Sequence, residues 1–204
     1  MLYWLIDILR QIFIDDVWHV DISFLPKNLT EHYKKELWNH HLDAIYIATE
    51  YREIEDYLAK YKFYSQREYV DLFGDLMSKL DKKYQIFEDK KSILVPVPMH
   101  WSRYFSRWFD HNRYLIKHMA KNVDISYEIL LSTSWTSHQS KLSRIKRLEN
   151  KKNSLKMNHS RCIPDTVILF DDVISTWSTA TECARVLKEA GVKKVIWIFL
   201  ASNL

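Results

Sequence analysis

Glycine is scarce in this sequence. The 204 residues include 2 glycines and 8 tryptophans, whereas glycine makes up about 7% of an average globular protein. Glycine tolerates positive φ angles and close backbone approach at the lowest cost. Either this fold makes its turns with other residues, or several tryptophans stand where the native protein has glycine. A UGA codon that the cell reads as glycine but that is translated here as tryptophan would produce this pattern.

Cysteine and long hydrophobic runs are also scarce. Two cysteines, Cys162 and Cys183, are too few for a disulfide framework or a cysteine-based metal cluster, and they fit a reducing compartment. The apolar residues 1–14 are interrupted by Asp7 and Arg10, so they do not form a membrane-spanning run. We therefore expect a cytoplasmic protein without a membrane segment.

The rest of the composition predicts one globular domain. Hydrophobic residues make up 47% of the chain, which is enough to bury a full core. The net charge of +4 suits an anionic ligand without requiring nucleic acid. An amphipathic pattern near the start predicts a helical N-terminal extension over residues 1–41, followed by an α/β domain over residues 42–204.

Apolar runs alternate with helical patterns along the second part of the chain. This alternation predicts a doubly wound, mostly parallel sheet with flanking helices. The expected strands cover residues 42–46, 92–98, 127–131, 167–170 and 194–201. Helices are expected over 51–80 and from the turn at 175–179 to about residue 190, where Gly191 would end the helix.

The stretch from Val167 to Thr179 carries the strongest chemical signal. Val167–Phe170 is an unbroken apolar run, as expected of a strand covered on both faces, and Asp171 and Asp172 follow at its carboxyl end. A hydroxyl-rich turn then opens a helix, whose N-terminus suits a phosphate. A phosphate-binding site beside two carboxylates indicates a phosphorylated sugar as ligand, whose hydroxyls or bound Mg²⁺ would contact the two acids.

This stretch resembles the binding motif for phosphoribosyl pyrophosphate (PRPP) in type I phosphoribosyltransferases, which reads as an apolar strand, Asp-Asp and Thr-Thr-Gly-x-Thr. The resemblance implies that Asp171 and Asp172 contact the ribose hydroxyls or Mg²⁺, directly or indirectly. It also implies a 5′-phosphate site, made by Ser175, Thr176, Trp177, Ser178 and Thr179. Trp177 stands where the family has glycine, which alone lets the chain approach the phosphate so closely and turn so sharply. An indole is therefore expected at or near the phosphate.

A second motif resembles the ComF family. Residues 95–98 read Val-Pro-Val-Pro, and residues 107–111 read Arg-Trp-Phe-Asp-His where ComF proteins have Arg-Gly-Phe-Asn-Gln. Trp108 is therefore a second tryptophan at a glycine position. The resemblance places Arg103 and Arg107 near the pyrophosphate, since guanidinium groups suit phosphate oxygens. Asp110 or Asn112 is expected to cap the helix that follows.

A third motif lies in the basic segment 133–159. Its pattern Gln-x-x-Leu-x-x-x-x-Arg-x-x-Asn begins at Gln139 and includes Arg147, as in ComF proteins. In phosphoribosyltransferases the matching region is a mobile loop that closes over PRPP, and Gln139 and Arg147 are expected to contact the ligand. A solvated basic face or a nucleic-acid patch is the alternative reading.

Residues 54–63 end in Tyr-Lys-Phe and resemble a ComF phrase in which Leu-Lys-Phe ends a helix before a loop and another helix. Lys62 is thus a candidate ligand contact, although a lysine that only extends past a helix end is an equal alternative. The neighbouring histidines His40 and His41 point in different directions in any regular element, which argues against a metal site. ComF proteins often carry Cys-x-x-Cys zinc ligands, and since this chain lacks them we expect no zinc.

Together these motifs imply a type I phosphoribosyltransferase-like fold of ComF type. The implied activity is Mg²⁺-dependent transfer of ribose-5-phosphate from PRPP to an acceptor that the sequence does not identify, and a homodimer is expected because many such enzymes dimerise. The alternative is a non-catalytic adaptor or regulatory module that acts with the DNA-uptake machinery of natural competence. A third reading is an inactive homologue with genuine tryptophans at positions 108 and 177.

Overall fold

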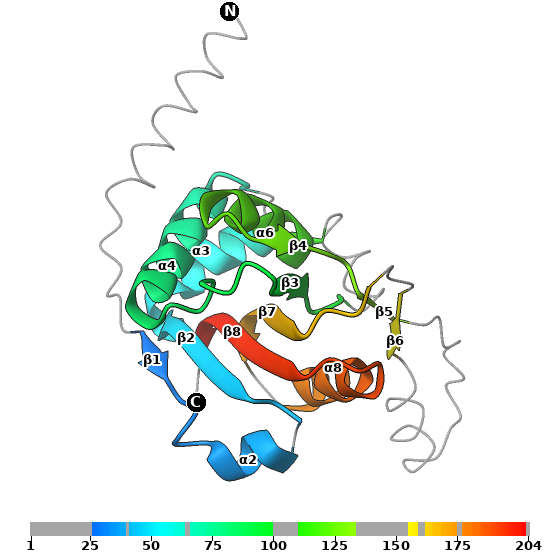
Figure 1. Ribbon diagram of the computed structural model, residues 1–204. Helices are drawn as coiled ribbons and strands as arrows, with labels where there is room; N and C mark the ends of the chain where they lie inside the picture. Colours follow the sequence, from blue (N-terminus) through cyan, green and yellow to red (C-terminus); the bar gives the residue numbers. More distant parts are fainter. Residues whose placement is uncertain are drawn as a thin grey trace, which may run out of the picture.

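The protein is an α/β fold built on one central sheet (Figure 1). A computed structural model describes residues 26–39, 41–63, 66–99, 110–133, 155–158, 162–174 and 177–202. The sheet has the order β1-β2-β8-β7-β3-β4. Its strands are β1 (Lys27–Asn28), β2 (Ala44–Glu50), β8 (Lys194–Ser202), β7 (Thr166–Ile174), β3 (Ile93–Pro96) and β4 (Ser126–Tyr127). All neighbouring pairs are parallel except β1 with β2, so the predicted mostly parallel sheet is confirmed.

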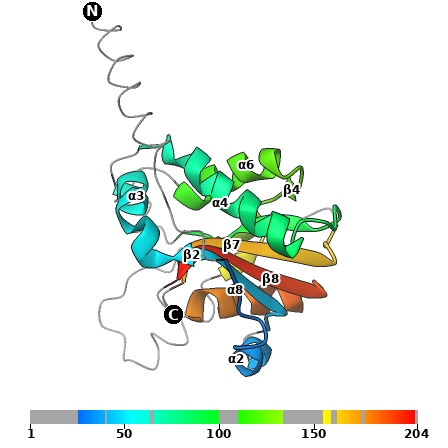
Figure 2. The ribbon, with the colours of Figure 1, turned by 90° about the vertical axis from the view of Figure 1, so that its left-hand side faces the viewer.

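Helices cover both faces of the sheet, as predicted for a doubly wound fold. Figure 2 shows α3 (Tyr51–Phe63), α4 (Tyr69–Tyr84) and α6 (His111–Asn122) on one face, and α8 (Ser178–Glu189) on the other. A short helix, α2 (Lys34–Asn39), lies near the β1–β2 side of the sheet, and β5 (Leu131–Thr133) and β6 (Leu155–Met157) form a separate antiparallel pair. None of the described helices is long and apolar enough to cross a membrane.

Several element boundaries differ from the sequence predictions. The helical stretch expected over 51–80 divides as the Tyr-Lys-Phe phrase predicted, because α3 ends at Phe63 and a second helix, α4, begins at Tyr69; α4 then continues past residue 80 to Tyr84. The strand expected over 127–131 divides into β4, which pairs with β3, and β5, which pairs with β6. The strand expected to end at Phe170 continues through both aspartates to Ile174, because β8 extends far enough to pair with it.

Two hydrophobic clusters lie on the two faces of the sheet. The α3-side cluster includes Phe170 and Ile198 and packs under α3, α4 and α6. The α8-side cluster includes Leu169 and Trp197 and packs under α8. Strand β8 supplies buried residues to both clusters and is buried along nearly its whole length. This two-sided burial explains why β7 and β8 read as unbroken apolar runs.

The N-terminal boundary remains a prediction. Residues 1–25, where most of the helical extension is expected, lie outside the described residues. Residues 27–39 lie against the sheet, because β1 pairs with β2 and Leu37 is buried in the α8-side cluster.

Candidate functional site

Two aspartates lie side by side near the carboxyl end of the central strand β7. The flanking strands β3 and β8 both pair with this part of β7, and Val97 N donates to Phe170 O at 2.8 Å where β3 ends. Side chains alternate between the two clusters as far as Phe170, but beyond the aspartates Val173 packs with the α3-side cluster and Ile174 with the α8-side cluster. The strand alternation therefore breaks at the aspartates, and both carboxylates contact residues of α6.

Asp172 is held by two donors from different helices. Lys62 Nζ, at the end of α3, lies 2.6 Å from Asp172 Oδ2, and His111 Nε2, at the start of α6, makes a short contact with the same oxygen. Burial raises the pKa of Asp172, but the His111 hydrogen bond and the Lys62 charge outweigh it and leave the pKa well below its usual value. Asp172 is therefore ionised throughout the physiological pH range.

Asp171 has different surroundings. Its Oδ1 accepts from Asn112 Nδ2 at 2.9 Å and from the backbone N–H of Asp172 at 2.9 Å. Burial, and then the adjacent charge of Asp172, raise the pKa of Asp171 to about 7. A carboxyl group that titrates near neutral pH is typical of a functional site.

The first residues of α6 are well fixed. Asp110 is the N-cap, and its side chain accepts from Arg113 N at 3.0 Å, which confirms one of the two predicted caps. The Tyr61 hydroxyl donates to His111 O at 2.9 Å. The Asn112 amide also reaches Val97 O at 3.5 Å, while its own oxygen is buried without a hydrogen-bond partner among the described residues.

Trp177 is the N-cap of α8, and its conformation does not need glycine. Its backbone has φ −69° and ψ −17°, which every L-residue adopts. The expectation that the backbone at this position needs glycine was therefore wrong. The indole packs edge-on against Tyr33 and Trp197, with ring centroids 5.2 and 5.8 Å away, and so rests on the α8-side cluster.

The structure brings together part of the predicted site. Asp171, Asp172 and Lys62 are in mutual proximity, and Lys62 contacts Asp172 rather than simply extending past the helix end. Thr179 is exposed in the first turn of α8, and Ser178 is the first residue of that helix. The remaining predicted contacts lie outside the described residues and stay predictions: Arg103, Arg107, Gln139, Arg147, Ser175 and Thr176.

Sequence reasoning missed three members of the site. His111 stands at a position where ComF proteins have glutamine, and this substitution was the only signal that could have pointed to it. In the sequence, Asn112 stands out only as a candidate helix cap, and Tyr61 only as part of a helix end. His111 and Asn112 contact the aspartates, and Tyr61 contacts His111. These contacts form only because α3, α6 and β7 are neighbours in the folded chain.

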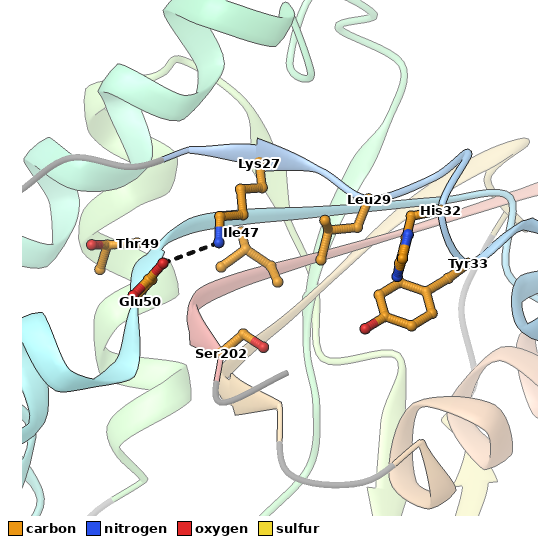
Figure 3. A pocket seen from close by; sticks show the side chains of 8 residues that line it. All are labelled: Lys27, Leu29, His32, Tyr33, Ile47, Thr49, Glu50 and Ser202. Atoms are coloured by element: carbon orange, nitrogen blue, oxygen red, sulfur yellow. Dashed lines mark hydrogen bonds and ion pairs between the residues drawn. The ribbon is translucent and has the colours of Figure 1, made fainter.

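A cavity of about 240 Å³ opens at the same carboxyl edge of the sheet. It lies at the last residues of β2 and β8, and its lining residues are Lys27, Leu29, His32, Tyr33, Ile47, Thr49, Glu50 and Ser202. Figure 3 shows Lys27 reaching toward Glu50 at one end of the cavity, with His32 and Tyr33 at the other. Tyr33 also packs against Trp177, so one wall of the cavity contacts the start of α8.

Known proteins support the ComF resemblance. No protein-family model matches the chain. Competence protein ComFC of Streptococcus pneumoniae is 25% identical over 149 residues, which is 73% of this chain and 63% of that protein. Competence protein F of Haemophilus influenzae is 30% identical over 109 residues, which is 51% of this chain and 48% of that protein. The chain is thus similar to two competence proteins of the ComF type over part of its length.

The ComF-like chain matches only about half to three-fifths of the length of these curated relatives. Among solved structures, a hypoxanthine phosphoribosyltransferase from Staphylococcus aureus overlaps with 65% of this chain and 62% of its own, at 15% identity and a TM-score of 0.36. An overlap this weak adds nothing to the description of the site.

Proposed function

We propose that this ComF-like protein binds PRPP and transfers its ribose-5-phosphate group to an acceptor nucleophile. One observation carries the proposal: the Asp171–Asp172 pair lies at the carboxyl end of β7, a few residues before α8 begins at Ser178. Ligands of open α/β sheets bind at this edge. The same arrangement of acids and helix start suits a sugar with hydroxyl groups at one end and a phosphate at the other.

The N-terminus of α8 is the proposed binding site for the 5′-phosphate. The helix has twelve residues, so its first backbone N–H groups and its dipole favour an anion. The Trp177 indole packs onto Tyr33 and Trp197. In that position it does not displace the backbone N–H groups of the first turn of α8. Ser175 and Thr176 would complete the phosphate-binding site.

The chemistry of the site suits a magnesium ion carried by the substrate. Within the described parts of the chain, no three His, Cys, Asp or Glu side chains converge to hold a metal by themselves. Mg²⁺ is nevertheless commonly bound by one or two carboxylates together with substrate phosphates, and the carboxylate of Asp171 fits that role. A bound Mg²⁺ would supply positive charge to the pyrophosphate. The protein residues would orient the ribose and exclude water.

In the proposed transfer, the bond between ribose C1 and the pyrophosphate oxygen breaks, and its electron pair leaves with pyrophosphate. The lone pair of the acceptor forms the new bond to C1, and the acceptor proton passes to the departing pyrophosphate. Positioning and charge stabilisation would supply most of the rate. Arg103 and Arg107 follow β3, so we place the pyrophosphate on the β3 side of β7.

An acceptor must approach C1 from the side opposite the leaving group. Strands β3 and β8 flank β7 on opposite sides, so the acceptor would enter from the β8 side. The cavity at the ends of β8 and β2 lies there, and it is the candidate acceptor site. At about 240 Å³ it is smaller than the 300–1,000 Å³ that are common for drug-sized ligands, which favours a small acceptor.

Calorimetry of PRPP with Mg²⁺ tests the proposal. Three proteins are compared: the chain as written, the Trp108→Gly/Trp177→Gly variant and the Asp171→Asn variant. We expect the chain as written to bind, because the Trp177 indole rests on Tyr33, and we expect Asp171→Asn to abolish most of the binding. Binding only by the glycine variant would support PRPP binding and the hypothesis that both tryptophans are recoded glycines. If neither the chain as written nor the glycine variant binds PRPP, the proposal is overturned.

A non-catalytic role is the second candidate, because both curated relatives are named as competence proteins. In that case the protein would bind PRPP or a component of the DNA-uptake machinery without turnover. Release of pyrophosphate in the presence of candidate acceptors separates the two functions. Cytoplasmic location and a homodimer remain predictions, and the dimer can be checked by light scattering.

A further inference from the structure

The two carboxylates of the site differ in what surrounds them. Asp172 is 7% exposed, and one of its oxygens receives both the Lys62 ammonium at 2.6 Å and the His111 imidazole. Asp171 receives only neutral amide donors, both at Oδ1. Within the part of the chain that the structure describes, Asp171 Oδ2 has no hydrogen-bond or ion-pair partner.

This difference decides which carboxylate is available to a ligand. The side chains of Lys62 and Asp172 are only 12% and 10% exposed, and burying either charge without the other costs several kcal/mol. A sugar hydroxyl that competed for Asp172 Oδ2 would have to displace an ammonium and an imidazole. Asp171 offers an oxygen without such competition.

The contacts of Asp172 also connect three elements. Lys62 comes from α3, His111 from α6 and Asp172 from β7. Next to Lys62, the buried Tyr61 donates to His111 O at 2.9 Å and places its ring edge-on to the imidazole, with centroids 6.4 Å apart. These contacts fix the start of α6 against β7, and Asn112 at that start holds Asp171.

We propose that Asp172 is a positioning residue, locked by Lys62 and His111, and that Asp171 alone supplies the carboxylate that contacts the ribose of PRPP. The two adjacent acids therefore have separate tasks. This assignment rests on the proposed function, since it names the residue that meets the substrate. Lys62 is likewise a positioning residue and does not contact the ligand.

A rescue experiment separates positioning from direct contact. Calorimetry with PRPP and Mg²⁺ is performed on Asp171→Asn, Asp172→Asn, Lys62→Met and the double variant Lys62→Met/Asp172→Asn. Each single change at 62 or 172 should weaken binding at least about tenfold, as is typical when a supporting contact is lost. The double variant removes both charges and keeps an acceptor for His111, so binding should return to within about threefold of the unaltered protein.

Two results would overturn the proposal. One is a double variant that binds no better than Asp172→Asn, which would mean that the ligand contacts the Asp172 carboxylate itself. The other is normal binding by Asp171→Asn. Lys60→Met is the matched control, because Lys60 is an exposed lysine on the same helix, and it should bind like the unaltered protein.

A second measurement does not depend on PRPP. The side-chain amide signal of Asn112 in a ¹⁵N NMR spectrum reports its hydrogen bond to Asp171. It should shift in Lys62→Met, return toward its original position in the double variant and stay unchanged in Lys60→Met. An unshifted signal in Lys62→Met would overturn the positioning role. If PRPP fails to bind but the signal behaves as expected, the proposed function falls while the positioning role of Asp172 stands.

Discussion

At the scale of single residues, the environment of a carboxyl group decides its protonation. Burial and the Asp172 charge raise the pKa of Asp171 to about 7, whereas hydrogen bonding and charge from His111 and Lys62 lower the pKa of Asp172 despite its burial. A raised pKa in the folded state means that folding favours the protonated form of Asp171. Its contribution to stability is present below about pH 4 and is lost as the pH rises through about 7.

The stability of the protein should therefore depend on Asp171 between pH 5 and pH 8. The free energy of unfolding should fall by roughly 1–3 kcal/mol as the pH rises across this window, and Asp171→Asn should remove most of this fall because an amide does not titrate. Urea unfolding at a series of pH values measures the effect. Asp172 does not contribute in this window, since its lowered pKa affects stability only below about pH 4. An identical slope in Asp171→Asn would show that another group is responsible.

Only part of the site could be predicted from the sequence. Asp171 and Asp172 were identified because strand, acids and helix start are consecutive in the chain, and Lys62 was identified from a family phrase. His111 and Asn112 could not be identified in the same way, because their contacts with the aspartates cross 61 and 59 residues of sequence. The chemistry of such a pair becomes visible only when the helix carrying it is placed beside the strand.

At the scale of elements, the start of α6 is the part on which the site depends. The Asp110 cap satisfies a backbone N–H that the helix itself leaves without a partner. The next two residues are His111 and Asn112, which hold the two aspartates. Fraying of the first turn would therefore reach the site directly.

Asp110→Ala should lower the free energy of unfolding by about 1 kcal/mol, which is typical for the loss of an N-cap. It should also weaken PRPP binding, because the donors to the aspartates lose their fixed position. Urea unfolding and calorimetry measure the two effects. Asp56→Ala is the matched control, since Asp56 is an exposed acid within α3. Equal behaviour of the two variants would contradict the role of the cap.

Element boundaries were harder to predict than element types. The apolar run at 167–170 predicted the strand, but its extension to Ile174 depends on pairing with β8, which local sequence does not reveal. The division of the expected 127–131 strand has a similar cause, because β4 and β5 pair with different partners. Propensity identifies a segment that can be a strand, and the available partners decide where it begins and ends.

At the scale of the whole molecule, the alternation of strands and helices predicted the fold class but not the strand order. The order β2-β8-β7-β3 places the two longest strands in the centre. Each of these strands has a partner on both sides and apolar residues on both faces. The edge elements β1 and β4 have two residues each and are exposed.

Amide hydrogen exchange should reflect this arrangement. The amides of β7 and β8 should exchange only through global unfolding, whereas those near β1 and β4 should exchange through smaller openings. Exchange followed by NMR in increasing urea distinguishes the two regimes. The prediction fails if β7 or β8 exchanges as readily as β1. Strand β2, which has β8 on one side and only the short β1 on the other, should be intermediate.

The central position of β8 has a consequence for how the protein is made. Val195 N donates to the Asp43 carboxylate across 152 residues of sequence, and β2 pairs with β8 over most of its length. During synthesis β2 must leave the ribosome long before its main hydrogen-bonded neighbour exists. Its apolar residues and free backbone groups stay open to incorrect pairing throughout that time. We therefore expect completion of the sheet to be a late and slow step of folding, and we expect the nascent chain to be prone to aggregation until β8 has been made.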